Sequence, residues 1–518
     1  MKRMVIFLVV ALCLVAGSAQ AKELVLAIGG ESRTGYDPTL GWGRYGNPLF
    51  QSTLLKRDSE MNVVPDLARS WELKADKLTW VVTIRDDAKF SDGTPVTADD
   101  VAYTFNTARH AGGSYDMTEL EEAVVTGPYS LKLKLKEPRI TFVHRLVTLG
   151  IVPKHLHGPE YARMPVGSGP YTLVRWAEGE HMVVEANPLY YGKKPTIDRV
   201  VFLFTDEETS FAAARAGKVD VVVVPQALAV QKLPGMRLHP VASVDNRGIM
   251  FPFVPDEGKA DNAGVAIGNN VTSDPAIRMA VNVAIDRQAL VSGILEGYGR
   301  VAYGVVDDLP WDEATARIED SDPACAVAIL EAAGWKEVKK GGPREKNGVK
   351  AEFTLVYPSS DSTRQALALA SADMMRKVGI YPKVIGKSWD EIKRLNHSCA
   401  VLFGWGSHNP VEVYNLYHSS LSGQGHYNAG YYVNDIVDGY LDEAMASDSF
   451  EASLASWKKA QWDGKTGSST RGDAPWAWLV NLTHTYFVKE GLDVGVSQIE
   501  PHGHGWPITA NITEWSWR

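Results

Sequence analysis

Two kinds of hydrophobic spacing alternate along the chain. Apolar and polar side chains alternate over Leu78–Arg85, and the short apolar runs Val219–Val224 and Phe353–Tyr357 have the length and β-branched content of strands. Between such runs, Pro323–Ala333 and Arg364–Val378 have the spacing of helices. Strands that alternate with helices predict an α/β fold.

Local sequence signals set the ends of these helices. Asp322 comes before Pro323, a favourable pair for a helix start, while Gly334 and Gly379 are typical of helix ends. The chain has 518 residues, 45% of them hydrophobic, and no internal repeat or long linker, so we expect two or more domains. The charged, glycine-rich segment Gly341–Lys350 predicts an exposed hairpin loop.

Residues 1–21 have the pattern of a secretory signal peptide. Lys2 and Arg3 precede the apolar run Val5–Ala16, and an A-x-A sequence ends at Ala21. We therefore expect cleavage before Lys22 and a periplasmic mature protein. No other apolar run approaches the ~18 residues that a membrane-spanning helix needs.

Charge and cysteine content exclude several function classes. The formal net charge is −9, or −11 once Lys2 and Arg3 leave with the signal peptide, which argues against nucleic acid as a partner. Cys325 and Cys399 then remain; they can pair or stay as thiols, and no Cys-x-x-Cys motif is present.

Residues 41–46 spell the dinucleotide fingerprint G-x-G-x-x-G. A true fingerprint follows a strand directly and opens a helix, whereas this segment follows a proline-containing loop and carries Trp42, Arg44 and Tyr45. We predict that it binds no nucleotide and that this glycine-rich loop, with Trp42, Arg44 and Tyr45, instead lines a ligand cleft.

Lys89–Val101 combines an Asp-Gly turn with a helix whose first turn is acidic. This segment resembles the signature of the large extracytoplasmic solute-binding proteins of ABC importers, the peptide/nickel-binding family, family 5. Further matching segments follow in family order at Gly167–Trp176, Asn187–Tyr191, Asp274–Arg287 and Ala332–Trp335. The resemblance covers essentially the whole chain after the signal peptide.

The resemblance implies a periplasmic-binding-protein fold of type II, with three subdomains in two hinged α/β lobes. It places lobe I at residues 22–250 and 480–518, with an outer subdomain at about 67–168, and lobe II at residues 251–479. The hinge crossings are expected near Asp245–Pro252 and Pro475–Asn481. It also implies a substrate-binding component, expected to be a monomer, that delivers its ligand to a membrane permease and its ATPase subunits.

The segment Pro501–Pro507 contains His502 and His504, separated by one glycine. In extended backbone the two imidazoles project from the same side, and with an unperturbed pKa of roughly 6.5 both are largely neutral at pH 7. We interpret them as a pair of metal ligands, the alternative being a surface turn rich in His, Gly and Pro.

The ligand is indicated by a departure from the family pattern. By resemblance, peptide carriers use an aspartate shortly after a Gly-Trp motif to bind the peptide amino terminus, but here Ser407 and His408 follow Gly404–Trp405. A buried ammonium without a carboxylate partner is costly, which disfavours oligopeptides. A di- or oligopeptide, or another small organic solute, remains the alternative ligand.

The nickel branch of the family is the better match at Pro501–Pro507. Its members, by resemblance, hold nickel through one or two histidines and a small organic chelator whose carboxylates meet arginine. Imidazole suits nickel, and two imidazoles leave about four octahedral positions for the chelator. Arg109 and Arg247 are the candidate carboxylate clamps, and His408 and His418 are candidates for a third metal ligand.

Aromatic side chains in glycine-rich segments are expected to wall the ligand off from water. Besides Trp42 and Tyr45, the candidates are Trp405, Tyr414 and Trp506.

The remaining histidines have other interpretations. We expect His484 to pack or hydrogen-bond in the core and His426 to be a polar loop residue. His155 and His157 form a second H-x-H pair that competes with the later one.

An enzyme is not expected. The chain has no H-E-x-x-H motif, nucleophile elbow or phosphate-binding loop, and therefore no predicted catalytic residue or catalytic cofactor. A secreted metal-dependent hydrolase is the distant alternative.

Overall fold

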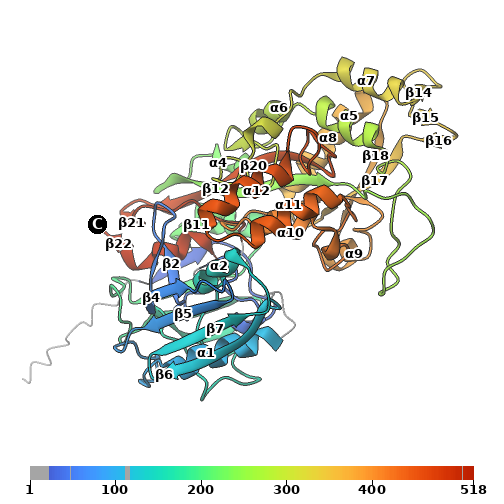
Figure 1. The fold of residues 1–518 in the computed structure, drawn as a ribbon. Coiled ribbons are helices and arrows are strands. Elements are labelled where there is room, and N and C mark those ends of the chain that lie inside the picture. The colour runs from blue at the N-terminus through green and yellow to red at the C-terminus, as the bar shows by residue number, and fades with distance from the viewer. Residues whose placement is uncertain (1–22, 47, 111–116, 504–505) are drawn as a thin grey trace, which may run out of the picture.

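The computed structural model describes residues 23–46, 48–110, 117–503 and 506–518. Figure 1 shows two lobes, one built mainly from the N-terminal third of the chain and the other from its middle, with the long strands of residues 236–250 and 476–489 running between them. The predicted signal peptide and His504 lie outside the described residues. Within the described ranges, no helix is both long enough and apolar enough to cross a membrane.

An 11-stranded mixed sheet runs through both lobes. Its order is β18-β17-β19-β12-β20-β11-β1-β10-β9-β8, with β13 also paired to β20. β1 is parallel to β10 and β11, and β17 is parallel to β18 and β19, while the other pairs are antiparallel. The bounds are β18 (Tyr381–Lys387), β17 (Glu352–Pro358), β19 (Ala400–Phe403), β12 (Met236–Met250), β20 (Trp476–Lys489), β11 (Val221–Val224), β1 (Leu24–Ala27), β10 (Arg199–Leu203), β9 (His181–Ala186), β8 (Tyr171–Ala177) and β13 (Gly299–Val301).

The continuous apolar runs of the sequence become interior strands of this sheet. β11 is four consecutive valines, three of them buried, as expected for a strand covered on both faces. β17 includes the predicted strand Phe353–Tyr357 and extends it by one residue at each end.

β12 and β20 carry the chain between the lobes. β20 pairs with β11 of lobe I over Thr485–Val488, whereas β12 pairs with β19 of lobe II over Gly248–Met250. The β12–β20 ladder shifts register between Ala242 and Asn246. The change from lobe I partners to lobe II partners thus lies along these two strands, and the domain boundaries at 250 and 480 stay predictions.

The outer subdomain of lobe I is a four-stranded antiparallel sheet, β4-β5-β7-β6, covered by α1 (Figure 1). α1 begins at Ala98, and Val101 and Phe105 on its inner face are fully buried. Nearby lie the hairpin β2-β3 and helix α2, which bring side chains towards lobe II. The bounds are β4 (Ala68–Leu73), β5 (Thr79–Ile84), β6 (Leu120–Gly127), β7 (Ser130–Leu135), α1 (Ala98–His110), β2 (Leu55–Arg57), β3 (Val63–Pro65), η2 (Ile140–Phe142) and α2 (Val143–Thr148).

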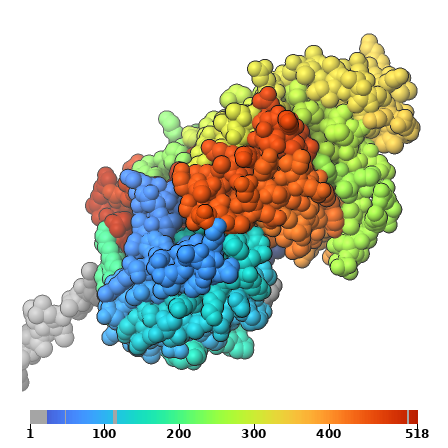
Figure 2. Space-filling model, viewed as in Figure 1, coloured from blue at the N-terminus to red at the C-terminus, as the bar shows by residue number. Residues whose placement is uncertain are grey.

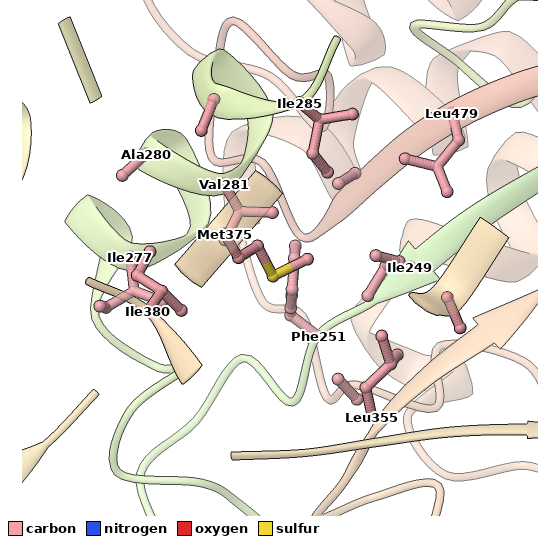
Figure 3. Close-up of a cluster of buried hydrophobic side chains, with 14 of the residues drawn as sticks. Ile249, Phe251, Ile277, Ala280, Val281, Ile285, Leu355, Met375, Ile380 and Leu479 are labelled. Carbon is pink, nitrogen blue, oxygen red and sulfur yellow. The ribbon is translucent and has the colours of Figure 1, made fainter. Parts of the chain in front are cut away.

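Lobe II has its own hydrophobic core. Figure 3 shows Ile277 and Val281 of α5 beside Met375 of α8, with Ile249 of β12 and Leu355 of β17 on the sheet side. The bounds of the helices that pack around this sheet are α5 (Pro275–Ala284), α6 (Arg287–Gly293), α7 (Pro323–Ala332), α8 (Ser362–Lys377) and α9 (Trp389–Lys393).

Two local predictions in lobe II are confirmed. The Asp322 side chain accepts a hydrogen bond from the Cys325 backbone N–H, and Pro323 is the first helical residue of α7. Within Gly341–Lys350, β15 (Arg344–Lys346) and β16 (Val349–Lys350) pair as the expected hairpin, and β14 (Lys336–Glu337) adds a third strand.

Three helices of lobe II, α10 (Val411–Tyr417), α11 (Asp435–Met445) and α12 (Phe450–Gln461), face the outer subdomain of lobe I. Lys77 forms an ion pair with Asp448, and the Arg139 guanidinium lies 5.0 Å from the centre of the Tyr414 ring. In Figure 2 the orange surface of these helices meets the blue and cyan surface of lobe I. The two lobes are therefore closed on one another.

The remaining elements are short, and they include the pair β21-β22 near the C-terminus. Their bounds are α3 (Glu207–Arg215), α4 (Gln226–Ala229), β21 (Leu492–Asp493), β22 (Ser516–Trp517), η1 (Pro38–Leu40), η3 (Ala314–Ala316), η4 (Ser419–Leu421) and η5 (Pro507–Glu514). Cys325 and Cys399 are free thiols, so they form no disulfide with each other.

Candidate ligand-binding site

A cavity of about 370 Å³ lies between the two lobes. Lobe I contributes the glycine-rich N-terminal loop, the end of β2 and α2, and lobe II contributes the segment after β19, α10 and a loop around residue 425. A cavity of this size suits a small ligand. Its lining residues are Arg44, Tyr45, Arg57, His144, Arg145, Thr148, Trp405, Ser407, His408, Asn409, Val411, Glu412, Asn415, Gln424, Gly425, His426 and Tyr427.

Three neutral imidazoles line the cavity. The Nε2 atoms of His144 and His408 and the Nδ1 atom of His426 are buried without a hydrogen-bond partner among the described residues. Burial, with a contribution from the Arg57 charge, lowers the pKa of His408 to about 3 and that of His144 well below its usual value. Burial also lowers the pKa of His426 to about 4. All three rings are therefore uncharged at pH 7.

Arg57, the last residue of β2, bridges the lobes beside these rings. Its Nη2 donates to Nδ1 of His144 at 2.7 Å and to the backbone oxygen of His408 at 2.8 Å. A guanidinium has no acceptor, so Nδ1 of His144 accepts and the ring proton lies on Nε2. One lobe I side chain thus fixes the tautomer of His144 and holds the His408 backbone of lobe II.

Glu412, in the first turn of α10, is the buried carboxyl group of the cavity. Its Oε2 accepts the backbone N–H of Ser407 at 3.0 Å. Burial raises the pKa of Glu412 to about 8, so the group is mostly neutral at pH 7. Glu412 corrects the expectation that this region offers no carboxyl group to an ammonium, because the chain supplies one from α10 rather than directly after Trp405.

Guanidinium groups dominate the charge of the cavity. Arg44, Arg57 and Arg145 line it, whereas Glu412 is mostly neutral. Nε of Arg145 also lies 2.9 Å from Oε1 of Glu119. The cavity therefore favours an anionic ligand.

His502 lies at the junction between the lobes. Its backbone N–H donates to the Gly406 oxygen at 2.7 Å, its Nδ1 is 2.5 Å from Oδ1 of Asp245, and its ring lies 6.0 Å from that of Tyr45 on the cavity wall. Although burial opposes ionisation of Asp245, the charge of Arg247 and hydrogen bonds from His484 and His502 hold its pKa well below the usual value. Nδ1 of His502 therefore donates to the carboxylate, and in the neutral ring the lone pair lies on Nε2, an arrangement common among metal-binding histidines.

A buried charge network supports His502 from the hinge strands. His484 lies between Asp245, at 3.0 Å, and Glu500, at 2.5 Å. Burial opposes protonation, but the hydrogen bonds to both carboxylates outweigh it and raise the pKa of His484 to about 9. Arg247 pairs with Asp245 in this network and does not line the cavity. His484 is thus buried, as expected, but carries a charge.

Among the residues expected at the cleft, Arg44, Tyr45, Trp405 and His408 line the cavity. Trp42 and Trp506 do not, because both pack in the core of lobe I. Nε1 of Trp42 donates to the Pro48 oxygen at 2.6 Å, and the Trp506 ring stacks on a phenylalanine of β10 at 4.3 Å.

Further predicted residues lie away from the lining. The rings of Tyr414 and His418 stack at 4.4 Å on the side of α10 that faces α11, and Nδ1 of His418 accepts a hydrogen bond from Ser420. Arg109 is in the last turn of α1 in the outer subdomain. Tyr414, His418 and Arg109 therefore do not line this cavity.

The competing H-x-H pair does not converge on one point. His155 bonds to Asp92 at 2.7 Å, and His157 bonds to Asp37 at 3.0 Å. Among the described residues, no group of three or more His, Cys, Asp or Glu side chains is placed to hold a metal ion.

Sequence reasoning missed Arg57, His144 and Glu412, and it placed His426 in a loop without a binding role. No spacing rule links these four positions, because the fold joins them from β2, α2, α10 and a loop. The signal available in the sequence was a carboxylate a few residues after the Gly404–Trp405 motif, and it applies only to Glu412.

Comparison with known proteins assigns the family. The family model described as bacterial extracellular solute-binding proteins, family 5 Middle, matches residues 62–428. The chain belongs to this family. Family 5 proteins are extracytoplasmic and bring small ligands to the permease and ATPase subunits of ABC importers, so this chain is the substrate-binding protein of such an importer.

Individual relatives of this family 5 protein differ in what they bind. Protein XP55 of Streptomyces lividans is 35% identical over 507 residues, covering 93% of this chain and 88% of that protein. The oligopeptide-binding protein AppA of Bacillus subtilis is 27% identical over 425 residues, covering 77% and 75%. The crystal structure of NikZ from Campylobacter jejuni in complex with Ni(L-His) matches with a TM-score of 0.80 and 25% identity, covering 95% of this chain and 99% of that one. The predicted two-lobed α/β fold is confirmed.

Proposed function

We propose that this protein captures nickel, held as a complex with a small carboxylate-bearing chelator, and delivers it to the permease of its importer. The observation that carries the proposal is the lining of the cavity between the lobes. Neutral imidazoles and three guanidinium groups meet there around a volume of about 370 Å³.

The imidazoles suit the metal. Nickel binds imidazole nitrogen well, and Nε2 of His408 is buried at the cavity without a partner among the described residues. His502 beside Tyr45 has the carboxylate–histidine arrangement that supports metal ligands elsewhere. We propose His408 and His502 as protein ligands of the metal. His504 remains a predicted second ligand beside His502.

The guanidinium groups suit the chelator. No group of three metal-binding side chains occurs among the described residues, so those residues alone do not fill a coordination sphere. The incoming complex must then bring most of its own donors. Arg44 and Arg145 on the cavity wall offer charge-assisted hydrogen bonds to carboxylates of such a chelator.

A small peptide is the second candidate, and Glu412 is the observation that favours it. A carboxylate there can pair with a peptide ammonium, in keeping with the oligopeptide-binding relative AppA. Ionising Glu412 at pH 7 against a pKa of about 8 costs about 1.4 kcal/mol, and the three arginines repel an ammonium as well. We therefore rank the peptide below the anionic nickel complex.

Thermal unfolding with different ligands tests the proposal. Nickel with citrate or L-histidine at 100 times its dissociation constant should stabilise the protein by about 2.7 kcal/mol, and dipeptides should not. His408→Ala should lose this stabilisation, whereas His181→Ala, on β9 away from the cavity, should keep it. Stabilisation by dipeptides and not by any nickel complex would replace nickel with a peptide as the ligand.

A further inference from the structure

Two N–H donors at the cavity have no partner among the described residues. Nε1 of Trp405 is one, and Nε2 of His144, a residue only 6% exposed, is the other. His144 belongs to α2 of lobe I, and Trp405 follows β19 of lobe II. A buried donor without an acceptor is costly, so a ligand that supplies oxygen acceptors gains affinity at both positions.

The proton on His144 is fixed by its neighbour. Nη2 of Arg57 approaches Nδ1 of His144 at 2.7 Å, and because arginine only donates, Nδ1 is the acceptor. Nε2 then carries the hydrogen and has no lone pair for a metal ion. His144 and His502 are therefore opposite tautomers, since the carboxylate of Asp245 draws the proton of His502 to Nδ1.

We infer that His144 is a specificity-determining residue that donates its Nε2–H to a carboxylate oxygen of the ligand, with Arg57 as the positioning residue that sets the tautomer. The inference rests on the proposed function and narrows its ligand class. The complex must present a carboxylate towards α2, and a chelator that binds nickel through amines alone lacks the required acceptor.

The Arg57 guanidinium also forms a contact between the two lobes. Nη2 of Arg57 also donates to the backbone oxygen of His408 at 2.8 Å, across the boundary between the lobes. The oriented donor of lobe I and the imidazole of lobe II are thus held together only when the lobes are closed. Arg57 links recognition of the carboxylate to the closed conformation.

Calorimetric titration of matched variants tests the role of His144. His144→Phe keeps a ring but removes the donor, and His144→Gln keeps an N–H donor. For nickel–citrate we expect His144→Phe to weaken binding about 10- to 100-fold and His144→Gln to stay within about threefold of the parent. His157→Phe, at a partly buried lobe I histidine outside the cavity, should bind as the parent does.

Two further measurements separate donation from packing. Nickel–ethylenediamine, which has no carboxylate, should bind weakly to the parent and be equally weak with His144→Phe. Nitrogen-15 NMR of the histidine side chains should show the proton of His144 on Nε2 in the parent, and a mixture of tautomers in Arg57→Met. A proton on Nδ1 in the parent, or equal losses for His144→Phe and His144→Gln, would overturn the inference.

Metal-free citrate and tricarballylate distinguish this inference from the proposed function. If the parent binds these anions and no nickel complex, and His144→Phe weakens the anions alone, the nickel assignment fails while the inference stands. If nickel complexes bind equally to the parent and to His144→Phe, the inference fails while the nickel assignment stands. Absence of binding by every carboxylate ligand, with or without nickel, overturns both.

Discussion

Replacing His484 with glutamine should destabilise the hinge in a pH-dependent way. The ring lies between the carboxylates of Asp245 and Glu500, at 3.0 and 2.5 Å, and these bonds raise its pKa to about 9 although burial opposes the charge. A rise from about 6.5 to about 9 corresponds to roughly 3 kcal/mol of folding free energy. This free energy agrees with the ~3–5 kcal/mol expected when one partner of a buried ion pair is removed.

The sign of the pH effect follows from the raised pKa. The stabilisation is fully present below the unfolded-state pKa near 6.5, and it is lost as the pH rises through about 9. Urea unfolding of the parent and His484→Gln should therefore differ by about 3 kcal/mol at pH 6 and by much less at pH 9.5. A difference that is small at pH 6, or that is the same at both pH values, would refute the charged state assigned to His484.

His181→Gln is the control for this experiment. His181 is on β9, far from the hinge in the sheet order, and its nearest carboxylate oxygen is 3.9 Å away on the exposed Glu180. Its substitution should change the unfolding free energy by about 0.5 kcal/mol or less at both pH values.

Three further predictions follow from the site and the hinge. In Glu412→Gln, the affinity for nickel–citrate should be independent of pH between 7 and 9. The parent should bind more weakly as Glu412 ionises with a pKa of about 8. Calorimetric titrations in which the two proteins show the same dependence of affinity on pH would contradict this. Gly404→Ala should lower the unfolding free energy by about 1–3 kcal/mol, because the new Cβ would lie 2.5 Å from Nη1 of Arg247 and 2.6 Å from Nη2 of Arg364; an unchanged urea midpoint would show that the arginines yield freely. The His502→Ala/His504→Ala double variant should keep its circular dichroism spectrum and lose its thermal shift with nickel and a chelator; a shift equal to that of the parent would place the metal away from this segment.

The fold was largely predictable because its signals are local. The Asp322–Pro323 helix start, the valine strand before residue 225 and the hairpin within Gly341–Lys350 each depend on a few neighbouring residues. The prediction of a hinge rested on the family resemblance, which the order of the motifs along the chain indicated. The strand pairing changes along β12 and β20, and the exact position of the hinge stays a prediction.

The site was predictable only in part, because distant segments build it. Trp405 and Tyr45 were found from glycine-rich sequence that leaves a ring free to face a cleft. Trp506 has the same local signal, but tertiary packing against β10 places it in the core. Arg57 and His144 are 87 residues apart and meet only because β2 and α2 pack together, so no local pattern marks them.

The position of nickel in a crystal grown with nickel and citrate, located by anomalous scattering at the nickel absorption edge, tests the proposed site most directly. We expect one nickel ion in the cavity between the lobes, bonded to Nε2 of His408, with a citrate carboxylate facing Nε2 of His144. Nickel bound outside this cavity, or a cavity occupied by peptide density while nickel is absent, would contradict it.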